Sequence, residues 1–128
     1  MSERPSAPWT AVVVTLFPEL FPGPLAASLL GAALAGDRWR LATVDIRAHG
    51  IGRHRAVDDT AAGGGPGMVM RADVATAALD QAIARAPVDA PCIYLSPRGI
   101  PLTQARARGL AAGPGVVGIP NAGVELKL

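Results

Sequence analysis

Short β-branched apolar runs alternate with helical segments along this chain, and that alternation restricts its fold more than any other feature. Apolar strands are predicted at residues 10–17, 39–46, 92–96 and 116–119, and helices at 25–35, 74–86 and from Thr103 to about Ala112. Strands connected through helices build a parallel sheet with right-handed crossovers, and ligands bind beyond the carboxyl ends of its strands. We therefore predict one α/β domain over residues 1–128, with its functional loops at that edge.

The predicted helices carry apolar side chains at helical spacing. In the first helix, Leu29 and Leu30 are expected to share one apolar face with neighbouring alanines. Asp73 is expected to cap the second helix, whose Ile83 belongs to the apolar positions. Both helices should therefore pack these faces against the sheet.

The composition is that of a folded protein from a reducing compartment. Half of the residues are hydrophobic and only 17% are charged, which excludes a disordered chain. The single cysteine, Cys92, lies in an apolar run, so we expect it to be a buried thiol without a disulfide partner. The start of the chain lacks an apolar signal core, and no apolar run is long enough for a membrane span. These features predict a cytoplasmic protein, and the sequence shows no metal-ligand cluster.

The stretch from Arg53 to Met70, RHRAVDDTAAGGGPGMVM, contains residues that an ordinary packed domain needs least. Arg53, His54 and Arg55 suit anionic groups, and glycines without a Cβ let a ligand approach the backbone closely. The functional interpretation is a loop that lines a ligand or nucleic-acid site; the alternative is a flexible surface loop. The run matches neither a Walker A loop nor a dinucleotide-binding fingerprint. Arginines and histidines that could add a basic face for RNA stand nearby, at Arg38, Arg40, Arg47 and His49.

Several motifs in the chain stand in a characteristic order. They are Thr15–Glu19 (TLFPE), Arg53–Arg55 (RHR) with Val57–Asp59 (VDD), Gly63–Met68 (GGGPGM), Tyr94–Gly99 (YLSPRG) and Leu102–Gln104 (LTQ). In this order and spacing, from about Trp9 to Val117, the chain closely resembles the amino-terminal half of the bacterial tRNA (guanine-N1)-methyltransferase family. That family methylates the guanine next to the anticodon. The resemblance implies the SPOUT fold, an α/β sheet with a carboxyl-terminal trefoil knot, and a homodimer.

The resemblance also implies a cofactor, a partner and site residues. The cofactor is S-adenosylmethionine, and one wall of its adenosine pocket would come from backbone groups of Tyr94, Leu95, Ser96, Pro97 and Gly99. The partner is tRNA, which Arg53, His54 and Arg55 would face, while Gly65, Pro66 and Gly67 would lie beside the methyl donor and target base. Asp58 is the nearest carboxylate for a catalytic role, although its place also suits orienting the loop or the guanine. The side chain of Tyr94 is expected to pack in the core, and Ser96 lacks the elbow motif of a nucleophile.

From Gly118 onward the chain departs from the family pattern. The family continues into a Cys-Gly-Arg-aromatic-Glu-Gly segment and a Gly-Asp-Tyr loop that thread the knot, followed by a helical RNA-binding domain that carries the aspartate base. None of these has a counterpart in this sequence. We therefore expect an incomplete SPOUT domain with impaired methylation. The alternative is a non-catalytic RNA-binding or dimer-forming remnant, whereas the joint motifs argue against an unrelated nucleotide-binding α/β enzyme.

Overall fold

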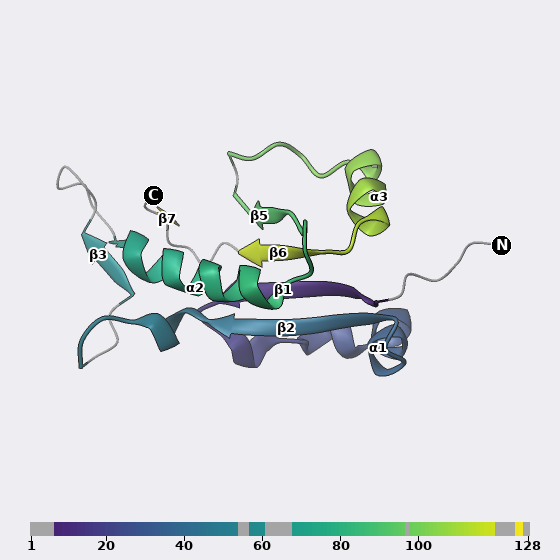
Figure 1. The fold of residues 1–128 in the computed structure, drawn as a ribbon, viewed down its shortest axis with the longest axis horizontal. Coiled ribbons are helices and arrows are strands. Elements are labelled where there is room, and N and C mark those ends of the chain that lie inside the picture. The colour runs from purple at the N-terminus through teal and green to yellow at the C-terminus, as the bar shows by residue number, and fades with distance from the viewer. Residues whose placement is uncertain (1–6, 54–56, 61–67, 97, 120–124, 127–128) are drawn as a thin grey trace.

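A four-stranded parallel sheet forms the body of the protein (Figure 1). The computed structural model describes residues 7–53, 57–60, 68–96, 98–119 and 125–126. The strands of this sheet are β1 (Trp9–Thr15), β2 (Trp39–Asp45), β5 (Cys92–Tyr94) and β6 (Gly115–Ile119), in the order β2-β1-β6-β5. All neighbouring strands are parallel. The predicted parallel α/β sheet is therefore confirmed, with strand boundaries that differ by at most two residues.

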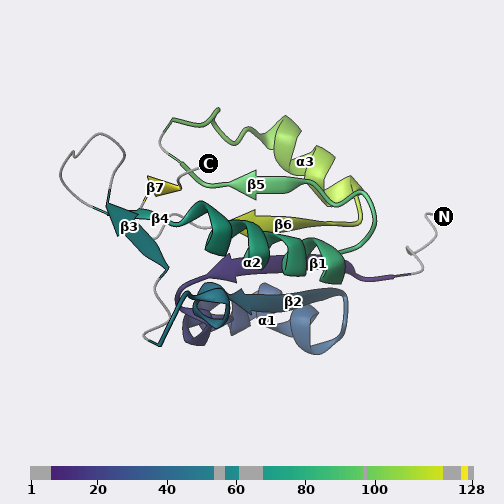
Figure 2. The same ribbon diagram turned by 60° about the vertical axis from the view of Figure 1, so that its left-hand side comes forward.

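Three α-helices cover the two faces of the sheet (Figure 2). They are α1 (Ser28–Ala35), α2 (Ala72–Arg85) and α3 (Gln104–Ala112); three short 3-10 turns, η1 (Pro18–Leu20), η2 (Gly23–Ala26) and η3 (Ile46–His49), join the elements. Side chains alternate between the faces of a strand, so Val12 and Val14 point to one side of β1 and Trp9 to the other. The valines pack in the core with α2, whereas the Trp9 indole N–H donates to Leu110 of α3. The helices α2 and α3 therefore lie on opposite faces.

The core is formed between α2 and the strand residues that face it. Its buried members are Val74, Ala75, Ala78 and Ala82 from the helix and Val12, Val14, Leu16, Val44, Ile46, Val117 and Ile119 from the sheet and its loops. Three of the four helix positions are alanine, which lets the helix backbone approach the sheet closely because little side-chain volume separates them.

The start and the exposed face of α2 differ from the prediction. The helix begins at Ala72 with Arg71 as its N-cap, so Asp73 lies inside the first turn and is not the cap. Arg71 Nε and Nη2 instead donate to the two carboxylate oxygens of Asp73, each over 3.1 Å. Ile83 is 50% exposed because it follows Ala82 and points about 100° around the helix from the buried stripe.

Three further expectations about burial are wrong. The predicted apolar face of the first helix does not reach the core: α1 has no buried residue, and Leu29 is 85% exposed. The helix packs beside β2, which is an edge strand, and residues 23–26 form a separate 3-10 turn. Cys92 and Tyr94 are also exposed, because β5 is the opposite edge strand of the sheet and is only three residues long.

A second, smaller sheet takes two of its three strands from the stretch predicted as a loop. It contains β3 (Asp58–Thr60), β4 (Met68–Met70) and β7 (Glu125–Leu126), in the order β3-β4-β7. Strands β3 and β4 are antiparallel, whereas β4 and β7 are parallel. The glycine-rich run between β3 and β4 lies outside the described residues. The residues on either side of it, Thr60 and Met68, pair with each other.

Candidate functional site

The carboxyl ends of the parallel strands lie along one edge of the main sheet, where the strand arrowheads point in Figure 1. The chain continues from β1 into Leu16 and Phe17, from β2 into η3 and Arg53, and from β5 into Leu95 and Ser96. The segments selected from the sequence therefore leave the sheet at one edge, as predicted. We call this the loop edge.

The first two loops are held at this edge by the side chains that end their strands. The hydroxyl Oγ1 of Thr15, a buried side chain, accepts a hydrogen bond from the Phe17 backbone N–H over 3.0 Å. In the neighbouring strand, Asp45 Oδ1 accepts one from the Arg47 N–H over 2.9 Å. These turns bring the Arg47 guanidinium to 5.5 Å from the centre of the Phe17 ring, within the range of a cation–π contact. A positive charge is thereby placed at the loop edge.

The basic segment follows η3, which is fixed to the body by its first and last residues. Ile46 is buried, and His49 Nε2 lies 2.5 Å from Gln81 Oε1 in α2. Gly52 then has φ of +75°, a backbone conformation that glycine adopts at little cost, and Arg53 is exposed to solvent. His54 and Arg55 lie outside the described residues.

The wider basic face suggested by the sequence does not form one surface. Arg38 and Arg40 lie at the start of β2, and Arg40 is 3.9 Å from Asp37 in an exposed ion pair. Arg47 lies just beyond the other end of that strand, roughly 20 Å away at the rise of a β-strand. Of the described arginines between Arg38 and Arg53, only Arg47 and Arg53 therefore lie at the loop edge.

Asp58, the candidate catalytic carboxylate, begins β3 and pairs with Met70 of β4. The same hairpin is joined to α2, because the Arg71 N–H donates to the Val57 carbonyl over 2.7 Å. This hydrogen bond and the strand pairing hold the backbone of Asp58 beside the start of α2. Gly65, Pro66 and Gly67 lie outside the described residues, so their predicted roles beside the methyl donor stay predictions.

The segment after β5 contains the tight turn that the sequence predicted. The Gly99 N–H donates to the Ser96 carbonyl over 3.0 Å, and the Arg98 N–H donates to the Ser96 hydroxyl over 3.2 Å. Leu95 extends the pairing with β6, because its N–H donates to the Ile119 carbonyl over 3.1 Å. Pro97 lies outside the described residues. The Ser96 hydroxyl is thus part of the turn.

The residues of this turn and of the strand end before it reach the surface. Tyr94 is 38% exposed and Leu95 is 56% exposed. A Cβ added to Gly99 would lie 3.2 Å from the Ser96 carbonyl oxygen, a distance tighter than most real Cβ contacts. Glycine therefore leaves space beside this carbonyl that the side chain of another residue would fill. A planar ligand that binds against the backbone needs such space.

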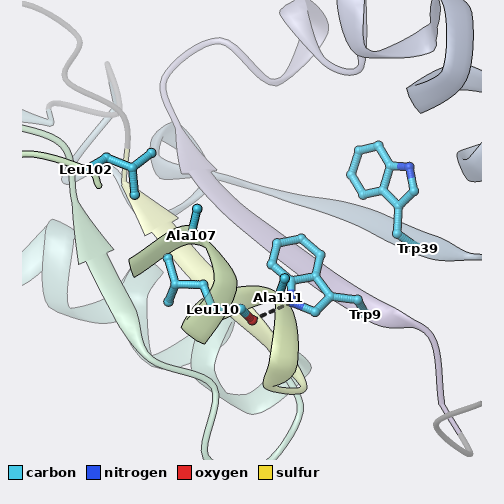
Figure 3. Close-up of a pocket in the computed structure, with 6 residues that line it drawn as sticks. All are labelled: Trp9, Trp39, Leu102, Ala107, Leu110 and Ala111. Atoms are coloured by element: carbon cyan, nitrogen blue, oxygen red, sulfur yellow. Dashed lines mark hydrogen bonds between the residues drawn. The ribbon is translucent and has the colours of Figure 1, made fainter. Parts of the chain in front are cut away.

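An apolar groove that the sequence analysis did not identify lies on the face opposite α2 (Figure 3). Its volume is about 470 Å³, and it is lined by Trp9, Trp39, Leu102, Ala107, Leu110 and Ala111. The two indole N–H groups donate to the carbonyls of Leu110 and Leu30, each over 3.0 Å, so their ring faces remain for packing. Each tryptophan is the first residue of its strand, and Trp9 pairs with Trp39 in register. The position of a tryptophan at the start of two apolar runs was the signal in the sequence for this groove. The groove is thus at the amino ends of the strands, away from the loop edge.

One carboxyl group near the loop edge has a shifted pKa. The side-chain hydrogen bond from Arg71 is the largest cause, and it lowers the pKa of Asp73 below its ordinary value. In the part of the chain that the structure describes, no three His, Cys, Asp or Glu side chains are grouped to hold a metal ion. The helices described here are too short or too polar to cross a membrane.

The fold is that of an α/β protein with a parallel sheet, and an exposed arginine and a tight turn lie at its loop edge. Residues 10–122 match the family described as tRNA (guanine-1)-methyltransferase TrmD, and the chain belongs to that family. The resemblance seen in the sequence is thereby confirmed.

Individual relatives agree with this assignment. The tRNA (guanine-N(1)-)-methyltransferase of Rhodopseudomonas palustris (strain TIE-1) is 62% identical over 107 residues, which are 84% of this chain and 42% of that protein. The one from Bradyrhizobium diazoefficiens is 60% identical over 112 residues, covering 86% of this chain and 44% of that protein. The chain therefore spans less than half the length of these curated relatives.

A solved structure shows the same fold. The crystal structure of tRNA (m1G37) methyltransferase from Aquifex aeolicus superposes with a TM-score of 0.74, at 23% sequence identity, over 88% of this chain and 50% of that one. This likeness confirms the predicted SPOUT-type α/β sheet.

Proposed function

We propose that residues 1–128 form one partial SPOUT domain that takes part in S-adenosylmethionine-dependent methylation of guanine N1 next to the anticodon of tRNA. The observation that carries this proposal is the loop edge: within a chain that matches the methyltransferase family, the basic segment and the turn at Ser96–Gly99 both leave the sheet there. Further proposals, supported by the family resemblance and the composition, are a cytoplasmic location and a homodimer.

The turn at Ser96–Gly99 fits the adenosine part of the cofactor. Its described backbone groups would hold the base through hydrogen bonds, and the missing Cβ at Gly99 leaves room beside the Ser96 carbonyl. When bound, the cofactor supplies an electrophilic methyl group on its sulfonium sulfur. The chain's own contribution is to hold and orient the adenosine, for which backbone groups of Tyr94, Leu95 and Pro97 are the further candidates.

The basic segment fits the phosphates of the tRNA. Arg53 is exposed at the loop edge, and His54 and Arg55 follow it directly in the sequence. A guanidinium group binds phosphate through two parallel hydrogen bonds, which position a nucleic acid without reading its sequence. Guanine N1 must lose a proton as it gains the methyl group, so a carboxylate near the target base would accept that proton or orient the base. Asp58 is our candidate for this part.

The first test is tRNA binding by filter assay at several salt concentrations, on the 128-residue chain and on a variant with Arg53→Ala and Arg55→Ala. Each lost phosphate contact should lower the slope of log affinity against log salt concentration by roughly 0.7 to 0.9. Arg108→Ala is the matched control, because it removes an exposed arginine from α3 on another part of the surface. An unchanged slope in the double variant, or an equal loss in the control, would contradict the RNA-binding role.

The second test is titration calorimetry with S-adenosylmethionine and, separately, with ATP. Because only one wall of the pocket is assigned in this chain, S-adenosylmethionine should bind weakly at most, and any binding should exceed that of ATP if the turn holds the cofactor. Binding of tRNA without any binding of S-adenosylmethionine would favour the non-catalytic RNA-binding alternative for this chain. Preference for ATP would contradict both hypotheses and favour a nucleotide-binding enzyme.

A further inference from the structure

The stretch that contains the glycine-rich run is joined to α2 at two points, one at His49 just before it and one at Arg71 just after it. At the first point, His49 at the end of η3 meets Gln81 in the third turn of α2. At the second, the Arg71 N–H donates to the Val57 carbonyl, and Arg71 is the N-cap of the same helix. One helix thus holds both ends of the stretch, which we call the loop stretch (residues 50–70).

The contact between His49 and Gln81 is suited to fixing a position. Its two atoms lie 2.5 Å apart, the pair is partly buried, and the residues are 32 positions apart in the sequence. The imidazole donates from Nε2–H to the amide oxygen in the tautomer that carries its proton on Nε2. The contact joins the end of η3 directly to α2.

Arg53 follows this contact closely in the sequence and is exposed to solvent. Three residues separate it from His49, and they include Gly50 and Gly52, the second with φ of +75°. Glycines give the backbone the greatest conformational freedom. A fixed point just before them therefore limits the number of positions that Arg53 can occupy. Ordering an arginine before it binds lowers the entropy cost of binding.

We propose that His49 is a positioning residue for the loop stretch: through its hydrogen bond with Gln81, it fastens the start of that stretch to α2 and presents Arg53 at the loop edge. This inference rests on the proposed RNA-binding function for its effect on affinity. Its structural part, the anchoring of residues 50–53, stands independently of RNA.

The structural part is tested by amide hydrogen exchange of residues 50–53 in the 128-residue chain. His49→Ala and Gln81→Ala should each accelerate exchange there by about 2- to 12-fold, the factor that corresponds to losing one net hydrogen bond. His49→Gln, whose amide can still donate to Gln81, should restore part of the protection. Gln104→Ala removes an exposed glutamine at the start of α3 and serves as the control. Unchanged exchange in Gln81→Ala would overturn the anchor, and this variant leaves the histidine in place.

The functional part is tested by tRNA binding across a salt series. Each single variant should bind about 2- to 12-fold more weakly with an unchanged salt slope, and the double variant should lose no more than either single one. A lower slope in His49→Ala but not in Gln81→Ala would show a direct phosphate contact and overturn the positioning role. Additive losses would overturn it as well. If Arg53→Ala with Arg55→Ala leaves binding unchanged while Gln81→Ala accelerates exchange, the proposed function fails and the anchor stands.

Discussion

Gly115→Ala should destabilise the fold severely, because a side chain at this glycine would collide with the backbone of the neighbouring central strand. It begins β6, has φ of +152°, and pairs with Thr10 of β1. An added Cβ would lie 2.8 Å from the Thr10 carbonyl carbon, 2.9 Å from its nitrogen, and closer still to its oxygen. Real Cβ atoms essentially never approach other heavy atoms within 3.0 Å, so the strands would have to separate at this pair.

The magnitude follows from what that separation would break. The hydrogen bond from the Thr10 N–H to the Pro114 carbonyl, 3.2 Å long, is worth about 1 kcal/mol. A non-glycine residue held at this φ costs about 1 to 3 kcal/mol more. We therefore expect a loss of about 2 to 4 kcal/mol in the free energy of unfolding, and a fall in Tm of at least about 4 °C.

Gly118→Ala in the same strand is the matched control. A Cβ at Gly118 would meet no atom within 4 Å. Adding it should be neutral, or stabilising by about 0.4 to 1 kcal/mol, because alanine has less freedom in the unfolded chain. Urea and thermal unfolding followed by circular dichroism measure both variants. Equal stability of the two variants would refute the argument that β6 approaches β1 too closely for a side chain at its first residue.

Three further predictions concern single contacts. Trp9→Phe removes the indole N–H that donates to Leu110, and it should cost about 0.5 to 1.5 kcal/mol in urea unfolding. Thr103→Ala removes the side chain that caps α3 and should cost about 1 kcal/mol, whereas Thr103→Ser should cost little. The pKa of Asp73 is lowered chiefly by its hydrogen bond with Arg71, so its stabilising effect is present above the ordinary value of 3.8 and is lost as the pH falls through the lower folded value. The difference in Tm between wild type and Asp73→Asn should therefore shrink at acid pH; a constant difference would contradict the assignment.

The order and type of the main elements follow from local sequence patterns. The β-branched runs around Val12, Val44 and Val117 each form a strand of the parallel sheet, and Thr103 caps α3 as predicted. The tight turn at Ser96–Gly99 was also predictable, because proline and glycine restrict the local backbone to few conformations. Signals of this kind depend on neighbouring residues alone.

Burial was harder to predict, because it depends on where an element lies in the sheet. The strand that contains Cys92 has an apolar sequence, yet it forms an edge of the sheet, so its thiol is exposed. Leu29 similarly belongs to a helix that packs beside the other edge strand. Strand order comes from long-range pairing, which the periodicity of a single segment does not contain. The pairing of Asp58 with Met70 across the glycine-rich run was missed for the same reason.

The alanines of α2 connect the core to the candidate site. Ala75, Ala78 and Ala82 face the sheet and are buried, so this helix lies close to the strands whose ends form the loop edge. The same helix presents Gln81 to His49 and, at its N-cap, Arg71 to the hairpin. A larger side chain at Ala78 would push the helix away from the sheet, and it would therefore displace both anchors of the loop stretch together. The small side chains of this core are thus part of what positions the basic segment, although none of them contacts a ligand.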